Sequence, residues 1–198
     1  MFRKSLILIA ALAAPVAAAA APAQKAASAS ASASGWAVNY GASRLAFAAS
    51  MNGQAIDGAF RRWQAQVRFD PRNLAASEVK VVVDTGSAAT GDASRDQALP
   101  TDDWFAARAF PRATFTSQRF VSLGGDRYQA IGTLAIRGVS RPVTLPFRLT
   151  ITGAKAHAEG VVPIDRTAFG VGQNQWKGTE AVAARVDVRV SIDAQKAG

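Results

Sequence analysis

Hydrophobic and polar residues alternate along most of this chain, most regularly between residues 128 and 151. A period of two predicts a strand with one buried and one solvated face. Between the two halves of this stretch, Gly138 can take a positive φ and Pro142 suits the first residue of a strand, so the stretch predicts a β-hairpin. The apolar parity of its second half is Val143, Leu145, Phe147, Leu149 and Ile151.

The same alternation predicts further strands on both sides of the hairpin. Turns are expected at residues 53–58, 70–73 and 124–126, which are rich in Gly, Asp and Asn. Together with the hairpin this makes eight or nine strands, at the regular spacing typical of a β-sandwich or a β-barrel. The additional strands are expected at residues 35–40, 45–49, 59–69, 79–83, 113–123, 157–164 and 186–192.

One region, residues 91–110, interrupts the strands with a helical pattern. Asp92 can cap a first short helix, and Thr101 can cap a second one beyond Pro100. Helices this short are not stable alone in water. We therefore expect the insertion to pack on the sheet through its large apolar residues, Leu99, Trp104, Phe105 and Phe110.

These patterns favour an all-β fold, a closed antiparallel barrel of about eight strands with a short helical insertion. A β-sandwich filled by its own side chains stays open as the alternative, because alternation alone does not separate the two architectures. Several positions assigned to the inner face are small, which leaves room in a barrel for one small ligand: Ala46, Ala48, Ala65, Ala130 and Gly132.

The N-terminal residues predict export. Arg3 and Lys4 precede an apolar run and a series of small-residue cleavage sites, so residues 1–23 are interpreted as a secretory signal peptide. Residues 24–34 are Ala/Ser repeats that can bury little apolar surface, which is typical of a linker. The folded domain is therefore expected to span residues 35–198.

The charge distribution argues against nucleic-acid binding. The net charge is +9, of which +6 belongs to the domain, since Arg3, Lys4 and Lys25 are the only charged residues before position 35. The remaining basic residues are scattered over the polar faces of strands, whereas a nucleic-acid site gathers them on one face. The chain has no Cys and therefore no disulfide, thiolate ligand or thiol nucleophile.

The residues that could carry chemistry are few. His157 is the single histidine, and zinc normally takes three or four His or Cys ligands. No G-x-S-x-G elbow presents a serine nucleophile. No catalytic residue, metal site or cofactor is therefore predicted. Arg95 and Asp96 are interpreted as a structural ion pair or as the polar end of a pocket, and the loop with Asn174 is placed at a cavity mouth.

Several motifs in a fixed order resemble the YceI-like family, over residues 36–192. The resemblance implies a lipocalin-like extended barrel, a periplasmic location, and binding of a polyisoprenoid or a similar long apolar chain. The motifs are SRLAF at 43–47, SRDQAL at 94–99, FPRATFTS at 110–117, GTLAIRGVSRPVTL at 132–145 and DRTAFGV at 165–171.

The function expected from this resemblance is a periplasmic binding or carrier protein for one long-chain amphiphile. Burial of its tail would supply affinity at ~0.8 kcal/mol per CH₂ group. Arg95, Arg166 and Asn174 are the candidates for contacts with the polar end. The candidates for tail contacts, for most of which plain core packing fits as well, are Phe47, Trp63, Phe69, Phe105, Phe115, Leu134, Phe147 and Phe169.

Two other functions stay open at this point. The first is an enzyme acting on a lipid-like substrate, for which the sequence shows no recognisable nucleophile. The second is a non-catalytic module that docks on a membrane protein in a respiratory or quinone context, which would expose an apolar patch. The expected partner is a long-chain apolar small molecule and not a nucleic acid, with peripheral membrane contact and a homodimer left open.

Overall fold

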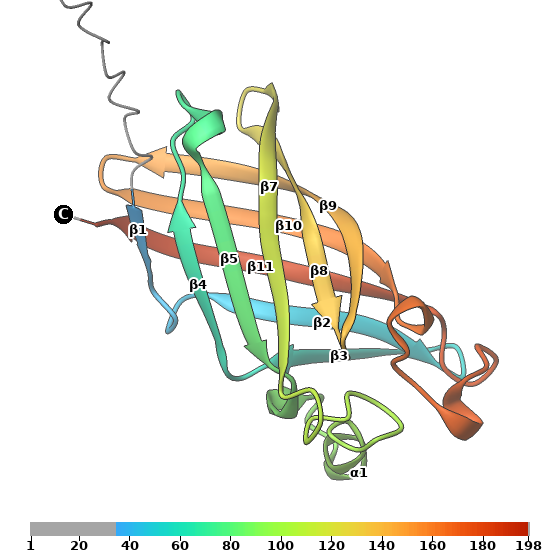
Figure 1. The fold of residues 1–198 in the computed structure, drawn as a ribbon. Coiled ribbons are helices and arrows are strands. Elements are labelled where there is room, and N and C mark those ends of the chain that lie inside the picture. Colours follow the sequence, from blue (N-terminus) through green and yellow to red (C-terminus); the bar gives the residue numbers. More distant parts are fainter. Residues whose placement is uncertain (1–34, 198) are drawn as a thin grey trace, which may run out of the picture.

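The computed structural model describes residues 35–197, so the predicted signal peptide and linker lie outside the described residues. Within these residues eleven antiparallel strands form one sheet, with one α-helix at its lower end in Figure 1. The helix is α1 (Ala93–Ala98), and short 3₁₀ turns occupy Leu74–Ala76, Thr85–Ser87, Thr167–Phe169 and Asn174–Trp176. The strands are β1 (Gly35–Val38), β2 (Arg44–Met51), β3 (Gln54–Phe60), β4 (Trp63–Arg68), β5 (Glu78–Asp84), β6 (Ala88–Ala89), β7 (Arg112–Gly124), β8 (Arg127–Ile136), β9 (Val139–Thr152), β10 (Lys155–Asp165) and β11 (Arg185–Lys196).

The sheet closes into a barrel because β1 pairs with β11 on one side and with β4 on the other. β1 and β2 pair with successive parts of β11, while β1 also pairs with β4 and β2 with β3. β1 with β2, and β3 with β4, therefore each make one side of the barrel, and the two-residue β6 only borders β3. Counted this way the barrel has eight strands. The predicted all-β barrel with a short helical insertion is confirmed, and the sandwich is excluded.

The hairpin of β8 and β9 has a shorter turn than the sequence predicts. Ile136 pairs with Val139, so only Arg137 and Gly138 form the turn, with φ of 50° and 75°. Two positive φ values match the right-handed twist of the flanking strands. The positive φ expected at Gly138 is confirmed. Pro142, expected as the first residue of the strand, is instead the fourth residue of β9.

The predicted turn at residues 53–58 is wrong. Only Asn52 and Gly53 turn, with φ of 51° and 76°, and β3 begins directly after them. An Asn-Gly pair between apolar runs is the usual signature of a two-residue hairpin. The strand predicted at 59–69 is consequently split, since the chain passes from β3 to β4 at Arg61 and Arg62.

The insertion is helical in its first part only. The Asp92 carboxylate accepts a hydrogen bond from the backbone N–H of Arg95 at 2.9 Å and caps α1, as predicted. The second predicted helix is wrong. The Thr101 hydroxyl donates back to the Ala98 carbonyl at 2.7 Å instead of capping forward, and residues 101–109 form successive turns. Phe110, expected to pack on the sheet, is 37% exposed.

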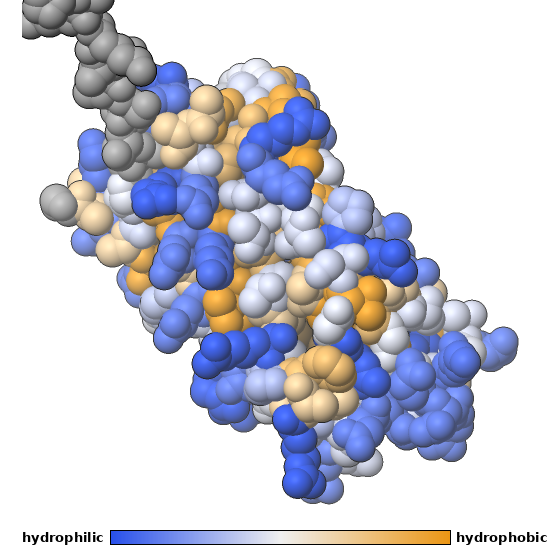
Figure 2. Space-filling model, in the orientation of Figure 1, coloured by the Kyte–Doolittle hydropathy of each residue, from blue (hydrophilic) through white to orange (hydrophobic). Residues whose placement is uncertain are grey.

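The core is divided between the two ends of the barrel. One cluster, built around Leu45, Ile136 and Phe169, lies next to the insertion and packs against Trp104 and Phe105. The other is built around Phe69, Phe120, Tyr128 and Ala130. Among residues 35–197 no helix is both long and apolar enough to cross a membrane. The face shown in Figure 2 carries apolar patches separated by polar side chains.

Candidate functional site

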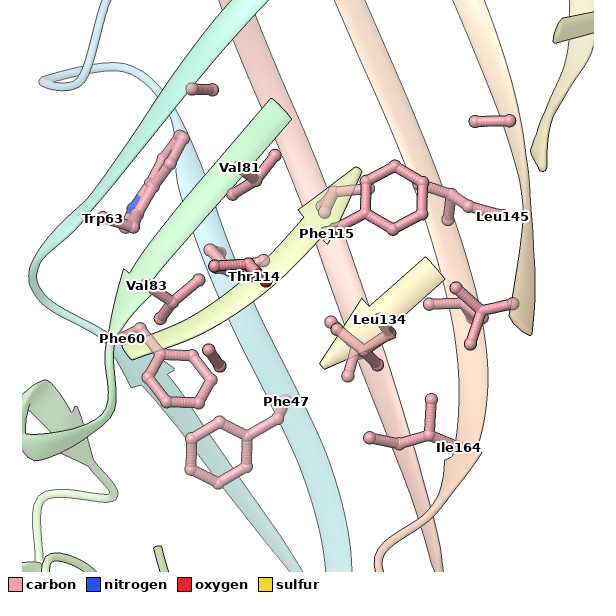
Figure 3. A pocket seen from close by; sticks show the side chains of 18 of the residues that line it. Phe47, Phe60, Trp63, Val81, Val83, Thr114, Phe115, Leu134, Leu145 and Ile164 are labelled. Carbon is pink, nitrogen blue, oxygen red and sulfur yellow. The ribbon is translucent and has the colours of Figure 1, made fainter. Parts of the chain in front are cut away.

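An internal cavity of about 310 Å³ lies between these two core clusters. Side chains from opposite walls of the barrel converge on it, among them Phe47, Trp63, Phe115, Leu134 and Ile164 (Figure 3). Leu99, Trp104 and Phe105 of the insertion also line it. Of the described residues around the cavity, only Glu159 and Arg166 are charged. A space with this lining favours an apolar occupant.

Only some of the small residues predicted for the inner face of the barrel line the cavity. Ala65 and Ala130 line the cavity. Ala46 and Ala48 do not, because the inward parity of β2 is Leu45, Phe47 and Ala49. At Gly132 a Cβ would lie 2.3 Å from the Thr116 carbonyl oxygen and 2.8 Å from the Phe115 ring, so this glycine allows close packing rather than adding open space.

All eight residues proposed for tail contacts line the cavity, although they come from strands far apart in the sequence and from three connecting segments. The barrel thus brings together residues that alternation alone could only assign to an inner face. The eight residues are Phe47, Trp63, Phe69, Phe105, Phe115, Leu134, Phe147 and Phe169.

An aromatic cluster closes the end of the cavity away from the insertion. The Phe69 ring lies 5.1 Å from Phe120, 5.5 Å from Tyr128 and 6.0 Å from Phe147, each time edge to face. This is the geometry that ring quadrupoles prefer. Because Phe69 is only 5% exposed, this end of the cavity is a packed floor.

The insertion covers the opposite end, where the rings of Phe60, Trp104 and Phe105 are only partly buried. Phe105 contacts Phe60 at 5.8 Å between ring centroids, and Phe60 contacts Phe47 at 5.5 Å. Trp104 packs against Trp176 of the 165–184 loop at 5.5 Å. Phe60 was missed in the sequence, because the Asn-Gly turn that places it on an inward-facing strand was not recognised.

Arg166 anchors the 165–184 loop from inside. Its side chain is buried, at 3% exposure, and donates to four backbone carbonyls within 3.1 Å. Its guanidinium also lies 5.8 Å from the centre of the Trp104 ring. Burial lowers the pKa of Arg166, and the nearby Asp165 carboxylate opposes that shift. The acceptors are the carbonyls of Val171, Gly178, Val182 and Ala183.

A guanidinium has five N–H groups, and four of those on Arg166 are used by this loop. The residue borders the cavity, as expected for the polar end, but its main interactions hold the loop that roofs the cavity. The role in loop structure had no side-chain signature in the sequence, since all four acceptors are backbone atoms.

The other two polar candidates lie outside the cavity lining. Arg95 donates from Nε to the Thr90 hydroxyl at 3.2 Å and lies 3.7 Å from Asp92, so both contacts are made with residues just before α1. Its neighbour Asp96 instead accepts from Thr90, so the two do not pair with each other. Asn174 donates to Asp103 at 2.6 Å and thereby ties the 165–184 loop to the insertion.

The single histidine lies on the barrel wall, away from the cavity. His157 Nδ1 is 3.0 Å from the Asp193 carboxylate, and both side chains are about 40% exposed. Within residues 35–197 no three His, Asp or Glu side chains are grouped as a metal site requires.

Comparison with known proteins assigns the family. A model of the YceI-like domain matches residues 36–194, so the chain belongs to the YceI-like family. A UPF0312 protein of Vibrio vulnificus is 32% identical over 145 residues, 73% of this chain and 64% of that protein. A UPF0312 protein of Yersinia pestis is 41% identical over 96 residues, 48% of this chain and 50% of that protein. The chain thus spans about half to two thirds of the length of these curated relatives.

Solved structures share the barrel. BcnA of Burkholderia cenocepacia is 34% identical and matches with a TM-score of 0.78, over 80% of this chain and 99% of that one. The YceI protein of Campylobacter jejuni is 23% identical, with a TM-score of 0.64 over 72% and 86% of the two chains. A polyisoprenoid-binding domain from Saccharophagus degradans is 15% identical, with a TM-score of 0.62 over 83% and 99%. The last two similarities concern the fold alone.

Proposed function

We propose that this protein binds and carries one amphiphile with a long apolar tail, a polyisoprenoid or a related lipid, in the periplasm. The observation that carries the proposal is the internal cavity, whose lining residues are apolar apart from Thr114, Glu159 and Arg166. The Saccharophagus degradans domain of the same fold, described as polyisoprenoid-binding, gives further support. The driving force is tail burial, at ~0.8 kcal/mol per CH₂ group.

The size of the cavity limits how much of a tail it holds. At ~30 Å³ per methylene-sized group, the volume that one water molecule occupies, 310 Å³ accommodates on the order of ten such groups. A longer chain displaces side chains or extends beyond the cavity. The insertion end, where Trp104 and Phe105 are only partly buried, is the proposed side for the polar group, with Arg166 beside Trp104.

The periplasmic part of the proposal rests on the predicted signal peptide. Protein purified from its own host is expected to begin between about residue 19 and residue 24, within the usual error in locating cleavage sites. N-terminal sequencing decides this. Met1 at the start of the purified protein would remove the argument for export.

The binding proposal is tested with delipidated protein and geranylgeraniol as the probe. Trp36, Trp63 and Trp104 line the cavity, so their fluorescence should change on binding. Native mass spectrometry of protein from the host should also detect a co-purifying amphiphile. Neither saturable binding nor a co-purifying lipid would be compatible with a carrier.

A pair of matched variants places the ligand inside the barrel. Ala158 lines the cavity, whereas Ala135 of β8 does not. Ala158→Phe should weaken geranylgeraniol binding at least tenfold by filling the cavity, while Ala135→Phe should leave it within about twofold, a tenfold change being ~1.4 kcal/mol. Equal effects of the two variants would place the ligand elsewhere. Neither alternative function, enzyme or docking module, is favoured by a specific feature of residues 35–197.

A further inference from the structure

One seam of the barrel is hydrogen-bonded over only half its length. β9 and β10 pair from Thr152 and Lys155 up to Phe147 and Gly160, and the ladder stops there. On their other sides both strands stay paired to their ends, β9 with β8 as far as Val139 and β10 with β11 as far as Asp165. Within the described residues, 139–146 of β9 and 161–165 of β10 thus face each other without a ladder.

Three prolines explain where this ladder stops. Because Ile136 and Val139 close the β8–β9 hairpin, the even-numbered residues of β9 direct their N–H groups away from β8, toward β10. Extending the register past Phe147 and Gly160 would match Pro146 with Val161, Thr144 with Pro163, and Pro142 with Asp165. Each of these pairs contains one proline, which has no N–H to donate.

The strands separate at a glycine. A Cβ at Gly160 would lie 2.5 Å from the Pro146 carbonyl oxygen and 3.1 Å from the Leu145 side chain, so β9 crosses β10 closely there. Beyond that point β9 is next joined to the turn that follows β10, by Arg141, whose Nε donates to the Ala168 carbonyl at 3.4 Å. The unpaired seam therefore has a defined top and bottom.

The cavity reaches both edges of this seam. Val143 and Leu145 of β9 and Val162 and Ile164 of β10 all line it. On the outer surface Val161 is 44% exposed. Apolar side chains, rather than backbone hydrogen bonds, separate the cavity from solvent here.

This difference sets the energy needed to open the wall. Parting any fully paired seam breaks a row of backbone hydrogen bonds, each worth about 0.5–1.5 kcal/mol net and more when its groups are left unsatisfied. Parting β9 from β10 between Arg141 and Gly160 breaks none of the ladder and only displaces apolar side chains.

We propose that the seam between residues 142–146 of β9 and 161–165 of β10 is a lateral gate, through which the apolar tail of the ligand enters and leaves the cavity. The inference rests on the proposed function and names the route to that same cavity. The prolines could have a simpler role, which is to protect two exposed strand edges against pairing with other chains. That role needs no passage of ligand, and the following test distinguishes it from a gate.

The test closes the gate covalently. The chain has no native Cys, so Thr144→Cys with Pro163→Cys gives two unique outward positions facing each other across the seam, to be joined by a short bis-maleimide. The matched control is Thr144→Cys with Ile131→Cys, which joins the same residue of β9 to its paired neighbour on β8. Each protein is compared with its own unbridged form blocked by N-ethylmaleimide, so that the effect of the substitutions cancels.

The measurement is the exchange of geranylgeraniol, followed by stopped-flow tryptophan fluorescence. Bridging residues 144 and 163 should slow association and dissociation at least tenfold with little change in Kd, while the control bridge should change both rates less than twofold. Unchanged rates across the bridged seam, with normal binding, would overturn the gate alone. Absence of binding by the wild type would overturn the proposed function and the gate together.

Restoring the missing donors supplies a second test without a cross-linker. Pro142→Thr, Pro146→Thr and Pro163→Thr combined should extend hydrogen-exchange protection along the seam and slow ligand exchange. Pro71→Thr, in the turn after β4, is the control and should do neither. New protection with unchanged exchange rates, or no new protection at all, would contradict the role given to the prolines.

Discussion

The ring of Phe47 occupies the space into which a side chain at Gly58 would project. The two residues are paired across β2 and β3, and a Cβ at Gly58 would lie 2.2 Å from Cζ of Phe47. Phe47 is 8% exposed and also contacts Phe60. The orientation of one of the main cavity-lining rings therefore depends on the absence of a side chain on the neighbouring strand.

Gly58→Ala is accordingly expected to lower the free energy of unfolding by about 1–3 kcal/mol, the usual cost of overpacking a core. Gly41→Ala is the control, since its nearest neighbouring atom would be the Asn39 Oδ1 at 3.4 Å, and it should leave stability unchanged or slightly higher. Urea midpoints of the two variants decide it. A shift at Gly58 no larger than that at Gly41 would mean that the Phe47 ring moves aside freely.

The fold was accessible from the sequence where one simple pattern determines the structure. Alternation located β5, β9 and β11, and the Asp92 cap located α1, because both signals depend on neighbours in the chain. Errors arose where a two-residue turn changes the register, as at Asn52 and Gly53. One misjudged turn hid a whole strand and with it Phe60.

The candidate site was accessible only in part. Large apolar residues on an inward parity line a barrel of necessity, so Phe47 and Leu134 could be assigned before the structure was known. The unpaired seam could not be predicted, because Pro142, Pro146 and Pro163 matter only once the register places one of them in each pair that would extend the β9–β10 ladder. The four backbone carbonyls that accept from Arg166 are likewise brought together only by the tertiary structure.

Removal of the Arg166 guanidinium should lower the free energy of unfolding. Arg166→Met leaves the carbonyls of Val171 and Val182 buried without their donors, and we expect a loss of about 3 kcal/mol or more in the free energy of unfolding. Arg185→Met is the control, because Arg185 is a mostly exposed partner of Asp187, and it should cost less than about 1 kcal/mol. Guanidinium denaturation measures both. Equal, small losses would show that the loop holds its conformation without the buried cation.

Asp165 should contribute to acid sensitivity. A hydrogen bond from the Thr167 hydroxyl, reinforced by backbone N–H groups, lowers the pKa of Asp165 below its ordinary value of 3.8. The unfolded state therefore binds this proton at a higher pH than the folded state does. The stabilisation is present above the ordinary pKa and is lost as pH falls through the lowered one.

Asp165→Asn should thus flatten the dependence of stability on pH below about pH 4. Thermal unfolding of wild type and variant at neutral pH and near pH 3 makes the comparison. The destabilisation caused by the substitution should be larger at neutral pH than near pH 3. A difference independent of pH would show that the Asp165 charge has no part in holding this turn.

The last prediction concerns Phe105 of the insertion. Two measurements together distinguish a ring that contacts the ligand from a ring that only closes the end of the barrel. Phe105 lines the cavity and packs on Phe60, but it is only partly buried, whereas Phe169 is 2% exposed in the core cluster beside it. Phe169→Ala should cost about 3–5 kcal/mol, as expected for a fully packed ring. Phe105→Ala should cost less, since part of its surface faces the cavity rather than packed side chains.

The loss of ligand affinity should follow the opposite order, larger for Phe105→Ala than for Phe169→Ala. A ligand tail that fills the cavity gains contact with Phe105 only when bound, so delipidated Phe105→Ala is expected to bind geranylgeraniol about tenfold more weakly, a change of ~1.4 kcal/mol. Phe105→Leu, which keeps most of the apolar contact, should recover most of that affinity and controls for loss of volume alone. Denaturant unfolding and a fluorescence titration on the same protein samples give both quantities. If stability falls as far as in Phe169→Ala while affinity stays unchanged, the insertion closes the barrel without touching the ligand, and the binding region must then be assigned to the strands alone.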